Sequence, residues 1–270
     1  MKTPIQLKKQ GYSGFTLVEM SVVLVIIGLI IGGLFTTLSA QVAQKNLSET
    51  RATIDSVKEA LLGYAMANGR FPCPAVAPAA GVTAVEAFVA GGSATNGTCA
   101  NFFNGYVPSV TLGMSSTDTT GYVLDGWNNP IRYAVSNLSD DANVTNIFTK
   151  SSGMKTANSA TCSPNCGMTW IANQTLLSVC STATGITGGV CSGTTSTLTS
   201  GAVIVVYSTG ENTATGGIGA DEAANLNGDT AFVSHEPFAT GAINGEFDDI
   251  VEWLSPSSIF GRLVQANQLP

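Results

Sequence analysis

An apolar run near the N-terminus, residues 15–38, constrains the fold more than any other feature of this sequence. It reads FTLVEMSVVLVIIGLIIGGLFTTL and contains a single charged residue, Glu19. As a helix, the run would be about 36 Å long, which is enough to cross a bilayer. An ionised side chain in hydrocarbon costs on the order of 3 kcal/mol. Glu19 therefore requires either an interfacial position or a partner.

The residues on either side of the run leave two general interpretations open. Lys2, Lys8 and Lys9 precede it, and no acidic residue does. This asymmetry predicts a cytoplasmic N-terminus and export of the rest of the chain. A secretory signal peptide fits this pattern, because residues 38–40 offer small side chains for cleavage. An uncleaved signal anchor fits it as well.

Residues 14–19, which read GFTLVE, support a third interpretation. They resemble the class III leader of type IV pilins and of type II secretion pseudopilins. In that family a prepilin peptidase cleaves after the glycine, and the new N-terminal phenylalanine is N-methylated. The resemblance implies cleavage between Gly14 and Phe15, methylation of Phe15, and an assembly role for Glu19. The Glu19 carboxylate of an incoming subunit would pair with the Phe15 ammonium group of a neighbour, because a buried charge is tolerated when it is paired.

The same resemblance implies a fold, partners and a location. The fold would be α+β and pilin-like, with a long N-terminal helix packed on an antiparallel β-sheet head that has long, disulfide-stapled loops. The partners would be other pilin or pseudopilin subunits, the prepilin peptidase and an inner-membrane assembly platform. The protein would cross the bacterial inner membrane once before assembly. It would then lie in a periplasmic or extracellular filament.

Helical periodicity continues well past the apolar run. Leu47, Ile54, Val57 and Leu61, followed by Tyr64 or Ala65, form an amphipathic stripe. Asn68-Gly69 then provides a helix stop. We therefore expect a leader peptide at 1–14, a helix at 15–68 whose first part (15–38) is the transmembrane and assembly segment, and an exported head at 69–270.

All six cysteines follow residue 70, which places them in the part expected to be exported. An even number of cysteines there predicts disulfides formed in an oxidising compartment, and their spacing does not fit a zinc site. We expect one bridge between Cys73 and Cys99. The other four cysteines allow three connectivities that sequence does not separate; they are Cys162, Cys166, Cys180 and Cys191.

The head has few strong local signals. Residues 124–133, LDGWNNPIRY, resemble a turn of the major pseudopilins of type II secretion, with Asn128 where that family usually has glycine. Trp127 is expected to be a core anchor, and Asp125 is not expected to be catalytic. We expect strands at 131–136, 168–173, 202–208 and 249–254, surface loops at 75–101 and 178–201, and a C-terminal helix after Ser255.

One group of oxygen-bearing side chains resembles a set of metal ligands. It comprises Asp221, Glu222, Asn225, Asn227 and Asp229, and it is followed by Glu246, Asp248 and Asp249. Calcium takes six to eight oxygen ligands, and major pseudopilins bind calcium in their C-terminal region. The spacing does not match an EF-hand, and solvated turns explain the same residues. The single histidine, His235, is expected to be a loop or packing residue.

Composition restricts the function further. Only 11% of residues are charged, and without residues 1–14 the chain would hold 8 basic and 18 acidic residues, a formal net charge of −10. Such a surface repels nucleic acid and acidic lipid. No motif for nucleotide binding, nucleophilic hydrolysis or metalloprotease chemistry occurs, so we do not expect an enzyme.

We expect a structural subunit of a type IV pilus or a type II secretion pseudopilus, and the large head favours a minor, tip-located one. A tip adhesin or substrate-binding protein on the same filament, and a signal-anchored periplasmic binding protein, are the alternatives.

Overall fold

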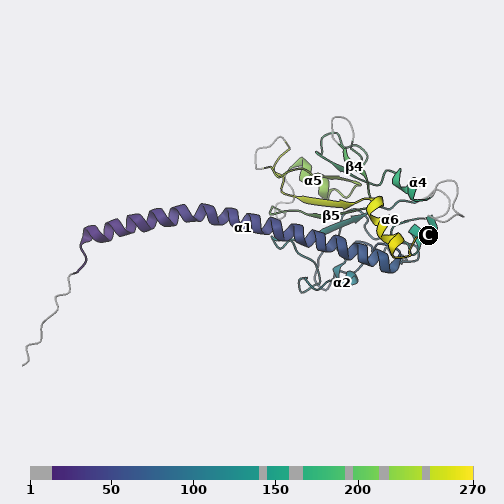
Figure 1. Ribbon diagram of the computed structural model, residues 1–270, viewed down its shortest axis with the longest axis horizontal. Coiled ribbons are helices and arrows are strands. Elements are labelled where there is room, and N and C mark those ends of the chain that lie inside the picture. The colour runs from purple at the N-terminus through teal and green to yellow at the C-terminus, as the bar shows by residue number, and fades with distance from the viewer. Residues whose placement is uncertain are drawn as a thin grey trace, which may run out of the picture. The chain divides into compact units, whose positions relative to one another are not determined.

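The computed structural model describes residues 14–139, 145–157, 167–191, 197–212, 219–238 and 244–269, with only the backbone for 31–40. The chain divides into two compact units, 1–45 and 46–270. We describe each unit by itself. From here on, the head means the second unit, residues 46–270, which includes the C-terminal part of the long N-terminal helix. Its elements are labelled in Figure 1.

A single helix, α1, spans Leu17–Asn68. Its extent agrees with the helix expected at 15–68 to within two residues at its start. The chain leaves the helix at Gly69, whose φ of 66° is a left-handed conformation that glycine adopts without strain. Among the described residues, no helix combines the length and the hydropathy of a membrane span.

The head contains two β-sheets. The first is antiparallel, in the order β1-β2-β5-β7, and its strands are Gly105–Tyr106, Arg132–Val135, Ile204–Ser208 and Ile250–Leu254. The second sheet has the order β4-β3-β6, and its strands are Thr197–Ala202, Leu177–Cys180 and Ala231–Val233. Strands β3 and β6 are parallel. The expected antiparallel sheet is therefore present, but a second, mixed sheet accompanies it.

Short helices surround the sheets. They are α2 (Ser109–Leu112), α3 (Gly153–Ala157), α4 (Met168–Ala172), α5 (Ala220–Leu226) and α6 (Pro256–Gln265). The strand expected at 168–173 was wrong, because this segment forms α4; a short apolar run carries no period that separates strand from helix. The loop expected at 178–201 was wrong at both ends, where β3 and β4 form. The C-terminal helix after Ser255 is confirmed.

The C-terminal part of α1 provides one side of the main core. Ile54, Val57, Leu61 and Ala65 of the predicted stripe are buried, together with Leu62. These side chains belong to one cluster with apolar residues of β2, β5 and α6. Trp127, the expected core anchor, packs against this cluster and is only partly buried. The amphipathic pattern thus correctly predicted which face of the helix the head covers.

Among the residues that the structure describes, two disulfides stabilise loops of the head. The expected bridge between Cys73 and Cys99 is present, and Cys180 is bonded to Cys191. Cys162 and Cys166 lie outside the described residues. The second bridge agrees with only one of the three connectivities that the sequence left open. It crosslinks the end of β3 to the segment that follows it.

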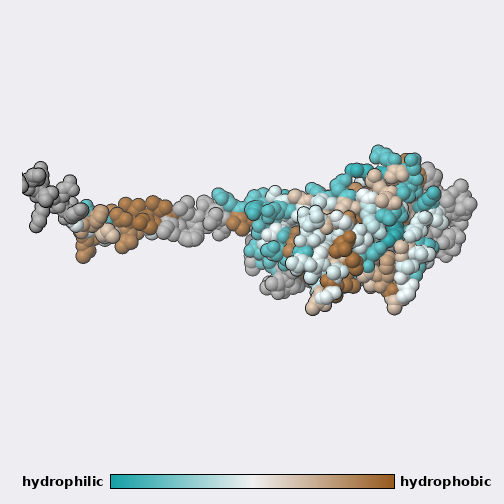
Figure 2. All heavy atoms as spheres, turned by 90° about the horizontal axis from the view of Figure 1, so that it is seen from below, coloured by the Kyte–Doolittle hydropathy of each residue, from teal (hydrophilic) through white to brown (hydrophobic). Residues whose placement is uncertain are grey.

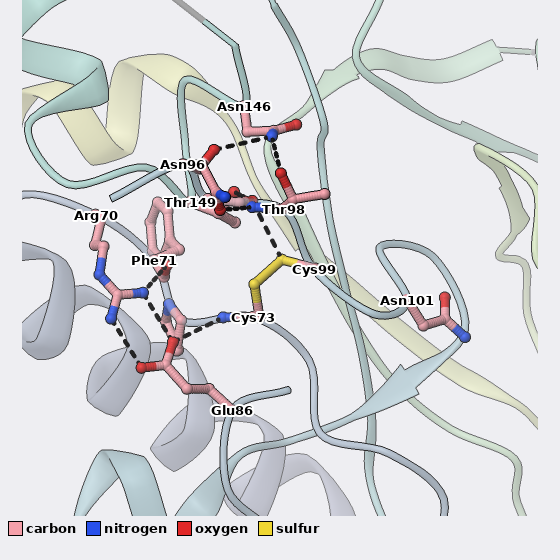
Figure 3. Close-up of a disulfide and its surroundings, with 12 residues drawn as sticks. Arg70, Phe71, Cys73, Glu86, Asn96, Thr98, Cys99, Asn101, Asn146 and Thr149 are labelled. Carbon is pink, nitrogen blue, oxygen red and sulfur yellow. Dashed lines mark hydrogen bonds and ion pairs between the residues drawn. A yellow bond between two sulfur atoms is a disulfide. The ribbon is translucent and has the colours of Figure 1, made fainter. Parts of the chain in front are cut away.

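The Cys73–Cys99 loop is also attached to the end of α1 by a buried ion pair (Figure 3). The two terminal guanidinium nitrogens of Arg70, Nη1 and Nη2, donate to the Glu86 carboxylate at 2.8 Å each. Arg70 also donates to the Tyr64 hydroxyl at 2.8 Å. Only 6% of Arg70 is exposed. Charge-assisted hydrogen bonds therefore hold Tyr64 of α1, Arg70 and the Cys73–Cys99 loop together.

The turn at 125–130 is a structural unit. The Asp125 carboxylate accepts hydrogen bonds from the backbone of Trp127 and Asn129, and from the Ser208 hydroxyl at 2.6 Å. Asn128 has a φ of 69°, which asparagine tolerates better than most residues. These contacts join the turn to the end of β5, so they give Asp125 a structural role.

Candidate functional site

The residues around the expected cleavage point lie directly before α1. Gly14 and Phe15 precede the first helical residue, Leu17, and 84% of Phe15 is exposed. A peptidase would therefore find this peptide bond outside regular secondary structure.

Thr16 and Glu19 form a reciprocal cap at the start of α1. The backbone N–H and the hydroxyl of Thr16 both donate to Oε2 of Glu19, at 2.9 Å. The backbone N–H of Glu19 donates to the Thr16 hydroxyl at 3.3 Å. This is the capping-box arrangement, in which a threonine and a glutamate three residues later satisfy each other's backbone donors. The capping role of Thr16 and Glu19 was not among the expectations from the sequence, although their T-x-x-E spacing is typical of a capping box.

The first turns of α1 expose apolar side chains on all sides. Leu17, Leu24 and Leu29 are 86%, 66% and 73% exposed, and the other large apolar residues from 18 to 30 are each at least 45% exposed. Exposed apolar surface of this extent marks a site of interaction with a membrane or with other protein. Glu19 is the only ionisable group within it.

Comparison with known proteins identifies this segment. Residues 9–35 match the family model of the prokaryotic N-terminal methylation motif. The chain carries a class III prepilin leader. The methylation motif includes Gly14, Phe15 and Glu19, and it is consistent with a type IV pilin-like protein. It also fits a protein that is first anchored in a membrane and then associated with a filament. No curated protein and no solved structure matches the chain.

A second candidate site lies in the head, where three carboxylates meet. Glu222 lies on α5, and Asp248 and Asp249 directly precede β7. One oxygen from each of the three lies within 4.8 Å of the others. Only 1% of Glu222 and 5% of Asp249 is exposed. We call these three residues the carboxylate cluster.

Two oxygens of the carboxylate cluster have no hydrogen-bond partner among the residues that the structure describes. They are Oε2 of Glu222 and Oδ1 of Asp248, and both are buried. Of their neighbours, Oε1 of Glu222 accepts from Asn212, and Oδ2 of Asp248 accepts from the backbone of Glu211. A Cβ atom on Gly210 would collide with the Asp248 carboxylate. The glycine therefore keeps space open beside an unpartnered oxygen.

Burial and mutual repulsion disfavour the charged form of the cluster. Burial, together with the nearby Glu222 charge, raises the pKa of Asp249 to about 8 and that of Asp248 to about 6. Because folding raises these pKa values above the usual value of about 4, the protonated forms are favoured in the folded state. Their stabilising contribution is complete below about pH 4 and is lost as the pH rises through 6 and then 8.

The other residues expected to bind metal have different roles. Asp221 accepts hydrogen bonds from Thr182, Asn244 and His235, and Asn225 binds the backbone of Val233 and the Asp249 carboxylate. Asn227 and Asp229 bond to each other in the turn after α5. Of the five expected ligands, only Glu222 belongs to the cluster. The fold brings Asp248 and Asp249 to Glu222 from more than twenty residues away in the chain.

His235 is a packing residue, as expected. Its ring stacks on Phe247 with 3.9 Å between centroids, and its Nε2 lies 3.2 Å from the Asp221 carboxylate. These contacts connect the segment after β6 to the start of α5.

Proposed function

We propose that this chain is a structural subunit of a type IV pilus or of a type II secretion pseudopilus. The methylation motif at 9–35 supports this function most directly. Prepilin peptidase would cleave between Gly14 and Phe15, and the Phe15 amine would then be methylated. The exposed apolar surface of α1 would hold the subunit in the inner membrane and would later pack against neighbouring subunits in the filament.

The geometry of Glu19 supports a direct role in assembly. Both contacts from Thr16 use Oε2, and within the described part of the chain these leave Oε1 to accept a second partner. In this proposal that partner is the Phe15 ammonium group of a neighbouring subunit. The capping box orients the carboxylate at the helix start, and pairing removes the cost of placing a lone charge in apolar surroundings. Glu19 would therefore set the axial register of each incoming subunit.

Cell fractionation tests the proposed function. The full chain is expressed in cells that hold the native assembly system, with and without the prepilin peptidase gene. We expect the chain in the sheared filament fraction only when the peptidase is present. Equal recovery in both strains, or its absence from filaments of the complete strain, would contradict the proposal.

We further propose that the carboxylate cluster binds calcium. The observation that favours this is the buried, unpartnered Oε2 of Glu222, beside two other carboxylates. Hard oxygen ligands of this kind suit calcium, and its charge would offset the repulsion among them. Glu222, Asp248 and Asp249 would hold the ion, which would crosslink α5 to the start of β7.

Thermal unfolding of the purified full chain tests the calcium site. At pH 7.5, calcium at 100 times its Kd should stabilise the chelator-treated protein by about 2.7 kcal/mol. Asp249→Asn should abolish this response without lowering the stability of the metal-free protein, because burial keeps the Asp249 carboxyl group largely protonated at this pH and asparagine has the same shape. Asp229→Asn is the matched control and should keep the full response. No calcium response in the unmodified chain, or loss of the response in the Asp229 variant, would contradict the site.

A further inference from the structure

A pocket of about 350 Å³ lies on the head, next to the loop that the Cys180–Cys191 disulfide closes. Its volume is within the range of about 300–1,000 Å³ that is typical of small-molecule sites. It shares no residue with the carboxylate cluster. Four segments that are distant in sequence line it, and their residues are Ser181, Thr182, Asp221, His235, Phe238, Asn244 and Gly245.

A buried carboxylate connects the walls of this pocket. Asp221 is 5% exposed, and it accepts a hydrogen bond from the Thr182 hydroxyl at 3.0 Å. The Nε2 atom of His235 lies 3.2 Å from the same carboxylate. The Asn244 amide donates both to Asp221, at 3.1 Å, and to Thr182, at 2.6 Å. Hydrogen bonds therefore hold the four segments in fixed positions around the pocket.

Phe238 adds a flat apolar surface to the pocket. It is 55% exposed, and it is the only exposed phenylalanine in the described part of the head. In Figure 2, teal and white atoms predominate on the visible face of the head, and brown areas are small. The backbone of Phe238 exchanges two hydrogen bonds of 3.0 Å with Phe247, and its ring centroid lies 5.2 Å from that of His235. An exposed ring on a fixed backbone offers a ligand a large contact at little cost in conformational entropy.

The charged groups of the pocket are already paired within the protein. Both oxygens of Asp221 accept hydrogen bonds. The two ring nitrogens of His235 face the Glu236 carbonyl, at 2.7 Å, and the Asp221 carboxylate. The hydrogen bonds of the Asn244 side chain to described residues all use Nδ2, so its Oδ1 can accept from a ligand. The Ser181 hydroxyl is the other neutral polar group. The pocket therefore favours an uncharged ligand.

We propose that this pocket binds a neutral hexose unit of a carbohydrate. One face of a hexose ring presents C–H groups, which suit the negative face of the Phe238 ring. Its hydroxyls can donate to Oδ1 of Asn244 and exchange hydrogen bonds with Ser181. The net charge of −10 without residues 1–14 disfavours an acidic sugar. This inference goes beyond the proposed function, because it concerns what the head binds and not how the subunit assembles.

Other classes of ligand use only part of the pocket. An apolar peptide side chain would cover the Phe238 ring but would leave the Asn244 and Ser181 groups without partners, which costs free energy once water is displaced. A charged ligand would find no unpaired counter-charge. A neutral sugar satisfies both the ring and the polar groups, and so the chemistry of the pocket selects it.

Saturation-transfer NMR on the purified full chain, in a deuterated detergent without a sugar headgroup, tests the pocket. The probes are glucose, galactose, mannose and N-acetylglucosamine, and the methyl ester of N-acetylleucine serves as the apolar peptide probe. Methyl protons of the protein are saturated, and the transfer to each probe is recorded. We expect at least one of the four sugars to bind with a Kd on the order of 1 mM, because one stacked ring and a few neutral hydrogen bonds give low affinity.

Substitutions at Phe238 show whether binding uses the ring. Phe238→Leu keeps an apolar side chain without a ring, and it should weaken sugar binding at least about tenfold; Phe238→Trp should keep it. Leu198→Ala is the matched control, because it removes an exposed apolar side chain of β4 outside the pocket. It should bind as the unmodified chain does. All three variants should unfold within a few degrees of the unmodified chain, because both positions are exposed.

Three outcomes overturn the proposal. They are the absence of binding by all four sugars, equal sugar affinity in the Phe238→Leu variant, and binding of the peptide probe in preference to every sugar. The last outcome would assign the pocket to an apolar peptide. None of these measurements depends on recovery of filaments, so their failure is distinguishable from failure of the proposed function.

Discussion

Replacing Glu19 by glutamine should leave peptidase cleavage intact and reduce incorporation into filaments by at least about tenfold. The substitution leaves the Phe15 ammonium group of the neighbouring subunit unpaired, and an unpaired charge in apolar surroundings costs several kcal/mol. Glutamine serves as well as glutamate in a capping box, so the Thr16 contacts and the start of α1 should be preserved. The variant therefore removes the charge of Glu19 and keeps its local structure. The measurement is the ratio of the chain in the sheared filament fraction to the chain in the membrane fraction.

Thr16→Val is the matched control for the Glu19 variant. It removes the hydroxyl that both donates to Glu19 and accepts from its backbone N–H, at a cost of about 1 kcal/mol to the helix start. The Glu19 charge is kept, so assembly should remain near normal. If the Thr16 variant failed to assemble and the Glu19 variant assembled, capping would matter more than charge, and the register role of Glu19 would be wrong.

Replacing Arg70 by methionine should destabilise the head by about 3–5 kcal/mol, because it leaves Glu86 partly buried without its partner. The exposed fractions of the two side chains are 7% for Arg70 and 18% for Glu86. Arg70 also binds Tyr64 and stacks near Phe88, with 5.9 Å between its guanidinium carbon and the ring centroid. The expected loss is measured by urea unfolding of the full chain.

Two further variants separate charge burial from lost packing. Arg262→Met removes an exposed ion pair with Glu59, at 3.4 Å, and should cost less than about 1 kcal/mol. The double variant Arg70→Met with Glu86→Leu replaces the buried pair by apolar groups and should recover much of the stability that Arg70→Met loses. Equal stability loss in the single and double variants would show that packing of Arg70, and not its charge, joins the loop to α1.

The sequence predicted the features that depend on local pattern. The extent of α1 followed from an uninterrupted helical period that ends at Gly69, and the stripe from Ile54 to Ala65 showed which face is buried. The methylation motif is a contiguous signal, so it could be recognised at residues 9–35 without a structure.

Features that depend on tertiary contacts were not predictable. The parallel pairing of β3 with β6 joins segments about fifty residues apart, and no local pattern indicates it. Segment 168–173 is apolar and too short for periodicity to separate helix from strand. The carboxylate cluster combines Glu222 of α5 with Asp248 and Asp249, whereas the ligands expected from the sequence all lie between residues 221 and 229. Close spacing in the chain was therefore a poor guide to which carboxylates meet.

The intact mass and N-terminal sequence of the chain purified from the membrane fraction test the central claim most directly. The account predicts a terminus at N-methylated Phe15 in cells with prepilin peptidase, and an uncleaved leader in cells without it. A terminus at Gln41 in both strains would show an ordinary secreted protein that has lost its assembly helix. An intact Met1 in both strains would show a signal-anchored protein, and either result would contradict a pilin-class subunit.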